Sequence, residues 1–208
     1  MVNSLNKEPA QSEDVVATIL VSASDPNWAK VAAENLYLTL TDHAHCEKKA
    51  AASAISLIST YPEDGVLVKA MAALASEEMG HFREVYDMLL QKEWTLERDE
   101  GDPYVKRLLS LVRQPPVQRK LDRLLISSLI EARSCERFHL LADEFESLGE
   151  QRQCQTFRRL AHSEAGHATL FLTLARRDDP SVADERLKEL AAKEAEIVAE
   201  LPLLPRIH

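Results

Sequence analysis

The residues that could carry chemistry are gathered in two copies of the pattern Glu-x-Gly-His. One copy runs from Glu78 to His81 and the other from Glu164 to His167, 86 residues further along the chain. A glutamate and a histidine three positions apart lie on the same face of a helix. Carboxylate and imidazole groups are ligands of divalent metal ions, so the repeat predicts a metal site built from two matching halves.

Each histidine of the repeat follows a glycine, and both glycines fall inside predicted helices. A glycine in a helix interior costs about 1 kcal/mol relative to alanine, so Gly80 and Gly166 need an explanation. Our hypothesis is that the missing side chain lets a neighbouring helix or a bound oxygen species approach the histidine closely.

A pair of metal ions in a four-helix bundle also takes one inward-pointing glutamate from each of the two other long helices. The predicted helix 26–60 supplies Glu47, which is surrounded by small residues. Glu34 lies too near the start of that helix to reach the level of Glu78. Glu47 is therefore the predicted ligand from this helix.

The predicted helix 117–148 offers two glutamates, Glu131 and Glu136. They lie about 140° apart around the helix, so both cannot point inward. Glu131 shares a face with apolar residues and lies 84 residues after Glu47, close to the spacing of the repeat, whereas Glu136 lies 89 residues after it. The pattern favours Glu131, and Glu136 stays the alternative. On this choice Glu136 and His139, a third Glu-x-x-His match, form a surface pair or one that supports the ligands.

The predicted ligands of two metal ions, through which catalysis would proceed, are Glu47, Glu78, His81, Glu131, Glu164 and His167. Four buried carboxylates are costly unless cations compensate them, and two divalent ions would supply four positive charges. An oxygen-rich set with one imidazole per ion suits iron or manganese better than zinc or copper. A pair of ferrous ions could pass electrons to dioxygen.

The rest of the sequence predicts the helices that position these ligands. Helix-forming residues are abundant and no alternating strand pattern is present, which predicts an all-α fold in a single domain over residues 1–208. The architecture expected is a four-helix bundle of two antiparallel hairpins, joined by a long connection and flanked by short helices. The predicted helices cover residues 12–23, 26–60, 64–92, 104–112, 117–148, 150–177 and a last one from 181, before an extended tail.

Composition narrows the class of protein further. The net charge of −9 argues against a chain that coats nucleic acid indiscriminately, and three widely spaced cysteines suggest neither disulfides nor a zinc knuckle. No run approaches 18 apolar residues and the first residues lack the features of a signal peptide, so we expect a cytoplasmic protein without a membrane segment.

Two segments are basic although the whole chain is acidic. Residues 103–130 carry six basic residues against one acid, and residues 151–177 carry five arginines against one acid. Either segment alone is most simply a solvated helix face.

Five strings carry a resemblance to a known family: DHAHCEKKAA, SEEMGHF, LIEARSCERF, AHSEAGH and ELPLLPRIH. Together they resemble the bacterial tRNA 2-methylthio-isopentenyladenosine hydroxylases, which are ferritin-like di-iron monooxygenases. The resemblance implies that the chain uses dioxygen and reductant to hydroxylate the isopentenyl side chain of the modified adenosine at position 37 of tRNA. It also implies that the six predicted ligands bind two iron ions.

The expected partners follow from that function. The basic segments could hold the anticodon stem-loop of tRNA through its phosphates. No flavin fingerprint or cysteine cluster is present, so electrons would come from an external electron-transfer protein. We expect a monomer. The alternatives are a ferritin-like iron-storage or ferroxidase protein, a non-enzymatic helical RNA-binding adaptor and, less favoured, a manganese enzyme acting on peroxide.

Overall fold

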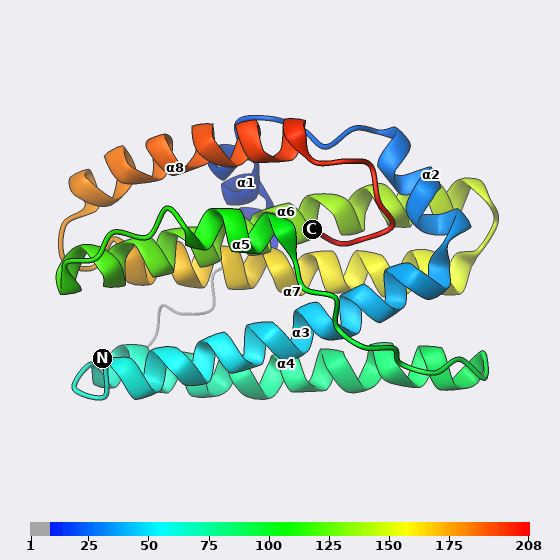
Figure 1. Ribbon diagram of the computed structural model, residues 1–208, viewed down its shortest axis with the longest axis horizontal. Helices are drawn as coiled ribbons and strands as arrows, with labels where there is room; N and C mark the ends of the chain where they lie inside the picture. The colour runs from blue at the N-terminus through cyan, green and yellow to red at the C-terminus, as the bar shows by residue number, and fades with distance from the viewer. Residues whose placement is uncertain (1–8) are drawn as a thin grey trace. The chain divides into compact units, whose positions relative to one another are not determined.

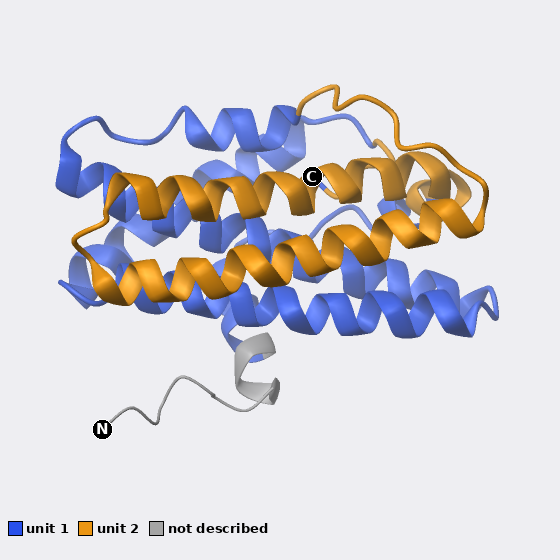
Figure 2. Cartoon of the chain, turned by 90° about the horizontal axis from the view of Figure 1, so that it is seen from below, with its two compact units in different colours: residues 1–30, 102–203, 208 blue, residues 31–101, 204–207 orange. Residues whose placement is uncertain are grey.

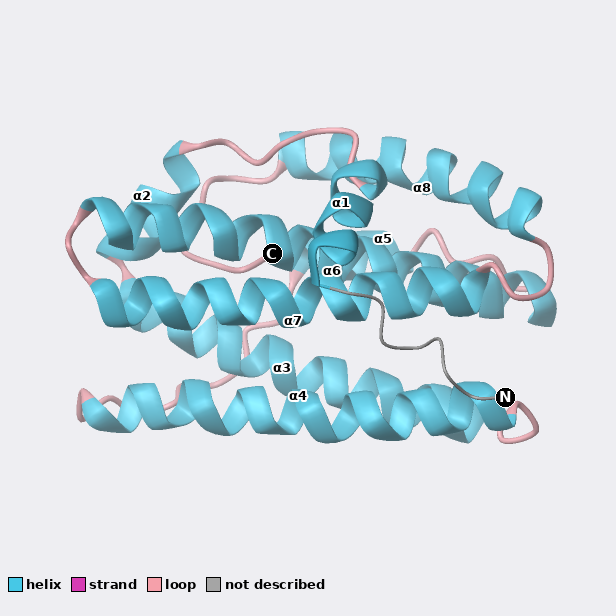
Figure 3. Cartoon of the chain, turned by 180° about the vertical axis from the view of Figure 1, so that it is seen from behind, coloured by secondary structure: helices cyan, strands magenta, loops and turns pink. Residues whose placement is uncertain are grey.

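Helices make up all of the regular structure in residues 9–208, the range that the computed structural model describes (Figure 3). The predicted all-α class is confirmed for this range. No helix within it is both long enough and apolar enough to cross a membrane. In chain order the helices are α1 (Pro9–Ile19), α2 (Asn27–Glu34), α3 (Leu36–Thr60), α4 (Gly65–Gln91), α5 (Pro103–Leu109), α6 (Pro116–Ser147), α7 (Gln151–Ala175) and α8 (Pro180–Glu200).

The chain forms two compact units, which Figure 2 shows in different colours. Unit 1 comprises residues 1–30, 102–203 and 208, and contains α1, α5, α6, α7 and α8. Unit 2 comprises residues 31–101 and 204–207, and contains α3 and α4. Each unit therefore holds one of the two predicted hairpins of long helices.

In unit 2, α3 and α4 form the hairpin and run side by side (Figure 1). The side chain of Asp64 accepts a hydrogen bond from the backbone N–H of Leu67 at 3.1 Å, which caps the start of α4. Buried residues then recur every three or four positions, as a helix with one face against a neighbour requires. They are Leu67, Met71, Leu74, Glu78, His81, Val85 and Leu89. The two predicted ligands on α4 thus share the face that carries its apolar residues.

In unit 1, α6 and α7 form the second hairpin. Gly149 ends α6 with a φ of 76°, a conformation that glycine adopts without strain. The ring of Phe157 lies 5.8 Å from the ring of Phe138 and 5.6 Å from that of Phe145. These aromatic contacts fix how α7 packs along α6.

The predicted helix boundaries hold within a few residues for the later helices, but the helix expected over 26–60 is interrupted. Asn35 has a φ of −117° and separates α2 from α3, and its side-chain amide donates to the carbonyl of Val31 at 2.9 Å. The hydroxyl of Thr39 donates to the carbonyl of Ala32 at 2.9 Å. The Val31 carbonyl also accepts the backbone N–H of Asn35 at 3.2 Å, so at this break the side-chain bonds are added to a helical one. The first helix lies earlier in the chain than the predicted range 12–23. It ends at Ile19, and Ser12, the expected cap, lies inside it.

The connection after α4 is irregular, as predicted, and is bound to the surface of α3 within unit 2. The hydroxyl of Tyr37 donates to the carbonyl of Thr95 at 2.9 Å, and His45 is hydrogen-bonded to the carbonyl of Glu97 at 2.7 Å. Lys48 and Lys49 approach the carboxylate of Asp99 at 3.8 and 3.7 Å. These contacts hold a loop that has no helix or strand of its own.

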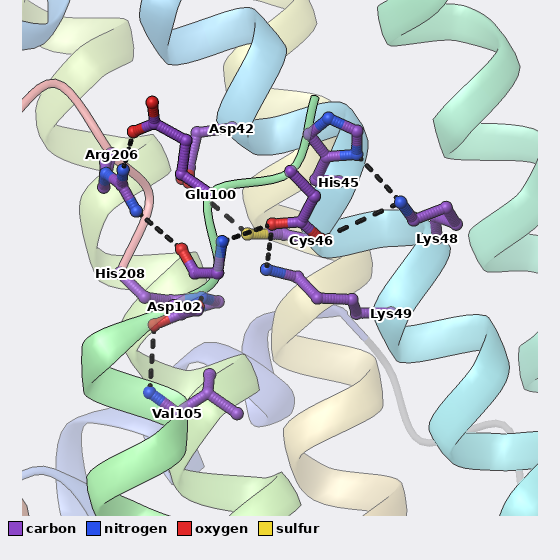
Figure 4. A network of polar contacts seen from close by, with 12 residues as sticks. Asp42, His45, Cys46, Lys48, Lys49, Glu100, Asp102, Val105, Arg206 and His208 are labelled. Atoms are coloured by element: carbon purple, nitrogen blue, oxygen red, sulfur yellow. Dashed lines mark hydrogen bonds and ion pairs between the residues drawn. The ribbon is translucent and has the colours of Figure 1, made fainter. Parts of the chain in front are cut away.

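The tail is also fixed within unit 2. Arg206 donates to the carbonyl of Gly101 at 2.6 Å and to the carboxylate of Glu100 at 3.0 Å (Figure 4). The backbone N–H of Ile207 donates to Asp42 at 2.8 Å, and the Ile207 side chain is buried. The predicted extended tail is therefore an ordered segment with specific contacts.

Candidate metal centre

Unit 2 brings three of the predicted ligands together, a group that we call the α3/α4 set: Glu47 on α3, and Glu78 and His81 on α4. All three side chains are buried. His81 Nδ1 lies 3.5 Å from Glu78 Oε2 and 3.7 Å from Glu47 Oε2. Each residue offers a ligand atom within 4.8 Å of those of the other two.

Unit 1 brings the other three predicted ligands together, and we call them the α6/α7 set: Glu131 on α6, and Glu164 and His167 on α7. These side chains are buried as well. His167 Nδ1 lies 3.6 Å from Glu164 Oε2, and ligand atoms of His167 and Glu131 lie within 4.8 Å of each other. The two sets have the same composition, two glutamates and one histidine each.

The distances between imidazole and carboxylate suit a shared cation better than direct hydrogen bonds. N–H···O hydrogen bonds in proteins are usually about 2.7 to 3.2 Å long, shorter than the separations of 3.5 to 3.7 Å in both sets. Two ligand atoms that each lie about 2.1 Å from one ion are roughly 3 to 3.6 Å apart. Each set also buries two carboxylates, whose charges one divalent ion would balance. The donor chemistry of each set therefore fits one iron or manganese ion.

A contact that sequence reasoning did not single out lies beside Glu47. His43 Nε2 lies 2.6 Å from Glu47 Oε1, and both side chains are buried. The two residues are four positions apart on α3, so they lie on the same face of that helix. The spacing within the string DHAHCE was the signal that could have revealed this pair.

Glu136, the alternative to Glu131, is engaged elsewhere in unit 1. Its carboxylate accepts from the backbone N–H and the hydroxyl of Ser24, both at 2.7 Å, and from Arg133 Nη1 at 2.5 Å. His139 lines an open groove of about 420 Å³ beside it. Glu131, by contrast, lies close to His167. Within unit 1, Glu131 is thus the glutamate of this pair that lies beside a predicted ligand, while Glu136 binds Ser24 and Arg133.

Arg133 is the centre of a buried polar network in unit 1. Its guanidinium donates from Nε and Nη2 to the two oxygens of Glu194, both at 2.9 Å, and Arg133 and Glu194 have no exposed surface. Tyr104 donates to the same carboxylate at 2.9 Å. Burial alone would lower the pKa of Arg133, but the hydrogen bonds and charge of Glu194 raise it above its ordinary value. Burial and the charge of Glu194 raise the pKa of Tyr104 well above its ordinary value. The network attaches α6, which carries Glu131, to α8 and α5.

The explanation offered for the two glycines is wrong with respect to a neighbouring helix. A Cβ atom added at Gly80 or at Gly166 would meet nothing within 4 Å among the described residues, leaving out its own helix backbone. Neither residue has a positive φ. Close packing therefore does not require glycine at these positions.

Several of the arginines in the basic segments are held by acids within unit 1. Arg113 forms a two-point ion pair with buried Asp122, at 2.7 and 2.9 Å, and Arg186 binds the same carboxylate at 3.0 and 3.1 Å. Burial raises the pKa of Asp122, but the hydrogen bonds of the two arginines outweigh it and hold that pKa below its ordinary value. Three further arginines form ion pairs in which both side chains are exposed: Arg107 with Glu200, Arg158 with Glu146, and Arg176 with Asp184. Within the two basic segments Arg107, Arg113, Arg158 and Arg176 therefore have an acidic partner.

Comparison with solved structures defines the class of protein. The chain resembles a solved structure described as "Protein 43 with aldehyde deformylating oxygenase activity" from Synechococcus, with a TM-score of 0.84 and 33% sequence identity. The match covers 91% of this chain and 94% of the other. The predicted ferritin-like helical class is thereby confirmed, in a fold that serves an oxygenase.

Sequence comparison identifies the family. The chain belongs to the tRNA-(MS[2]IO[6]A)-hydroxylase (MiaE) family, whose sequence profile matches residues 11–208. A tRNA 2-(methylsulfanyl)-N(6)-isopentenyladenosine(37) hydroxylase from Pseudomonas putida is 34% identical, over 82% of this chain and 82% of the relative. The hydroxylase of the same name from Salmonella typhimurium is 26% identical, over 86% of this chain and 80% of the relative. The family resemblance found in the sequence is confirmed.

Proposed function

We propose that this chain hydroxylates the isopentenyl side chain of 2-methylthio-isopentenyladenosine at position 37 of tRNA. The observation that carries the proposal is the family match over residues 11–208, together with curated relatives that bear this activity in their names. The fold of a solved oxygenase over 91% of the chain supports it. The substrate is then a tRNA, and the reaction a monooxygenation.

The proposed cofactor is a pair of iron ions, for which the α3/α4 set and the α6/α7 set would each supply two glutamates and one histidine. Support comes from the equal composition of the two sets and from the burial of all six side chains. When bound, two ferrous ions supply the electrons with which dioxygen is activated for insertion of one oxygen atom into a C–H bond. The protein's own residues hold the ions, neutralise their charge and exclude bulk water. A single domain over residues 1–208 is part of this proposal.

The overall reaction fixes the co-reactants that must be supplied. One oxygen atom of dioxygen enters the C–H bond and becomes the hydroxyl group, and the other is reduced to water with two electrons and two protons. The sequence has neither a flavin fingerprint nor a cysteine cluster that could hold an iron–sulfur centre. An external electron-transfer protein is therefore the proposed source of the electrons.

The tRNA would present its anticodon stem-loop, with the modified base turned out toward the metal ions as recognition of single-stranded RNA commonly requires. The basic residues of segments 103–130 and 151–177 are the candidates for phosphate contacts. Arg113 is a poor one, because its guanidinium already binds both oxygens of Asp122. Charge reversal at Arg113 should therefore lower stability more than tRNA affinity.

The decisive test is nucleoside mass spectrometry of tRNA from cells that lack this protein. The proposal predicts that the hydroxylated nucleoside disappears, that its unhydroxylated precursor accumulates, and that restoring the gene reverses both changes. Restoring a Glu131→Ala variant should not reverse them, whereas a Glu136→Gln variant should, provided that it folds. Unaltered hydroxylation in the deletion would refute the substrate assignment.

A second activity has one observation in its favour. The solved structure named for aldehyde deformylating oxygenase activity is 33% identical to this chain over 91% of its length. Incubation of the iron-loaded protein with an aliphatic aldehyde, dioxygen and reductant, followed by measurement of formate, tests this candidate. Because the family match favours tRNA, we expect no formate above a metal-free control.

A further inference from the structure

The side chain of His43 is placed to orient one predicted metal ligand. It has no exposed surface, and it lies one helical turn before Glu47 on α3. Its Nε2 atom is 2.6 Å from Glu47 Oε1. As a metal ligand Glu47 would be ionised and could only accept hydrogen bonds, so in the metal-bound state the proton of this contact lies on His43 Nε2. The tautomer of the imidazole is thereby fixed by its partner.

The two oxygens of Glu47 consequently have different surroundings. Oε1 accepts from His43, while Oε2 lies 3.7 Å from Nδ1 of His81, on the side where the other two members of the α3/α4 set offer their ligand atoms. Since Glu47 is only 4% exposed, bulk water competes little for either oxygen. The contact thus fixes Oε1, while Oε2 lies toward the imidazole of His81.

We propose that His43 is a positioning residue that holds the carboxylate of Glu47 in the orientation in which it would bind the ion of the α3/α4 set. The inference rests on the metal centre proposed above and adds a residue that the ligand pattern does not contain. Hydrogen-bonding partners behind a metal ligand fix its orientation, and their loss typically lowers metal affinity about 10- to 100-fold. The α6/α7 set does not include His43 or Glu47, so the second ion should be affected much less.

Two substitutions separate the hydrogen bond from the bulk of the side chain. The amide nitrogen of glutamine extends about as far from the backbone as Nε2 of histidine, so His43→Gln can keep the donor. The amide of asparagine extends only as far as Nδ1, so His43→Asn removes it. His45→Gln is the matched control, because His45 is also a buried histidine of α3 but is hydrogen-bonded to the carbonyl of Glu97.

The experiment is an anaerobic titration of the whole chain with ferrous iron, with bound and free iron separated by equilibrium dialysis. Wild type is expected to bind two ions. His43→Asn should weaken one of them by about 10- to 100-fold, while His43→Gln and His45→Gln stay within a few-fold of wild type. The ligand-field spectrum of the cobalt(II)-loaded chain is a second readout, and it should change in His43→Asn alone. Circular dichroism checks that each variant is folded.

The outcomes distinguish this proposal from the proposed function. Wild-type affinity in a folded His43→Asn variant would overturn the role of His43 and leave the metal centre standing. If that variant does not fold, His43→Gln decides, since a tenfold or greater loss there would contradict the role of the donor. Wild type that binds no iron would overturn both the metal centre and the role of His43.

Discussion

Replacing Arg133 by methionine should be among the most damaging single changes in unit 1. The substitution removes a buried guanidinium and leaves the carboxylate of Glu194, which has no exposed surface, without its two-point partner. It also removes a contact to Glu136 at 2.5 Å. Breaking a buried ion pair from one side costs about 3 to 5 kcal/mol. For a chain of this size each kcal/mol lowers the melting temperature by about 2 to 4 °C, so we expect a decrease of roughly 6 to 20 °C.

The assay is thermal and urea unfolding followed by circular dichroism, with Arg158→Met as the matched control. Arg158 pairs with Glu146, but both side chains are about half exposed, so its loss should cost less than about 1 kcal/mol. A variant that also carries Glu194→Leu should be more stable than Arg133→Met alone, because no unpaired charge remains buried. A loss below about 1 kcal/mol for Arg133→Met, or strictly additive losses, would refute this reasoning.

Three further predictions concern other parts of the chain. Gly80→Ala and Gly166→Ala should each raise the unfolding free energy by up to about 1 kcal/mol, because an added Cβ meets open space; lower stability in urea titrations would contradict the open geometry. The depressed pKa of Asp122 means that its stabilising effect is present above its unfolded pKa of about 3.9 and is lost as the pH falls through the lower folded value. The difference in free energy of unfolding between wild type and Asp122→Asn should therefore become smaller below about pH 4. A difference that does not change with pH would contradict the stabilising role of ionised Asp122. Deletion of His208 removes a hydrogen bond of 2.7 Å to Ser134 and a stacking contact with Tyr104. The free energy of unfolding should therefore fall by about 1 to 3 kcal/mol. An unchanged melting temperature would contradict a stabilising role of His208.

Features set by periodicity were predictable from the sequence. The buried stripe of α4 recurs every three or four residues, and this spacing alone places Glu78 and His81 on its apolar face. The same reasoning favoured Glu131 over Glu136, and within unit 1 Glu131 lies close to His167 while Glu136 binds Ser24. These inferences needed only the geometry of a helix.

Features set by contacts between distant residues were not predictable in this way. The interruption at Asn35 depends on side chains that bond to backbone carbonyls, which a helical pattern does not record. The engagement of Arg113 depends on its meeting Asp122 in space, so counting charges along the chain overstated the basic surface. His43 was missed because a pattern of ligands does not contain the residues that orient them.

The central claim is that this chain inserts one atom of dioxygen into the isopentenyl group of a tRNA nucleoside. Its most direct test incubates the iron-loaded protein with a chemical reductant, ¹⁸O-labelled dioxygen and tRNA that carries the unhydroxylated nucleoside, followed by mass spectrometry. The account predicts a hydroxylated nucleoside that carries one labelled oxygen, and no product from protein without iron. Incorporation of oxygen from water, or the same yield without iron, would contradict it.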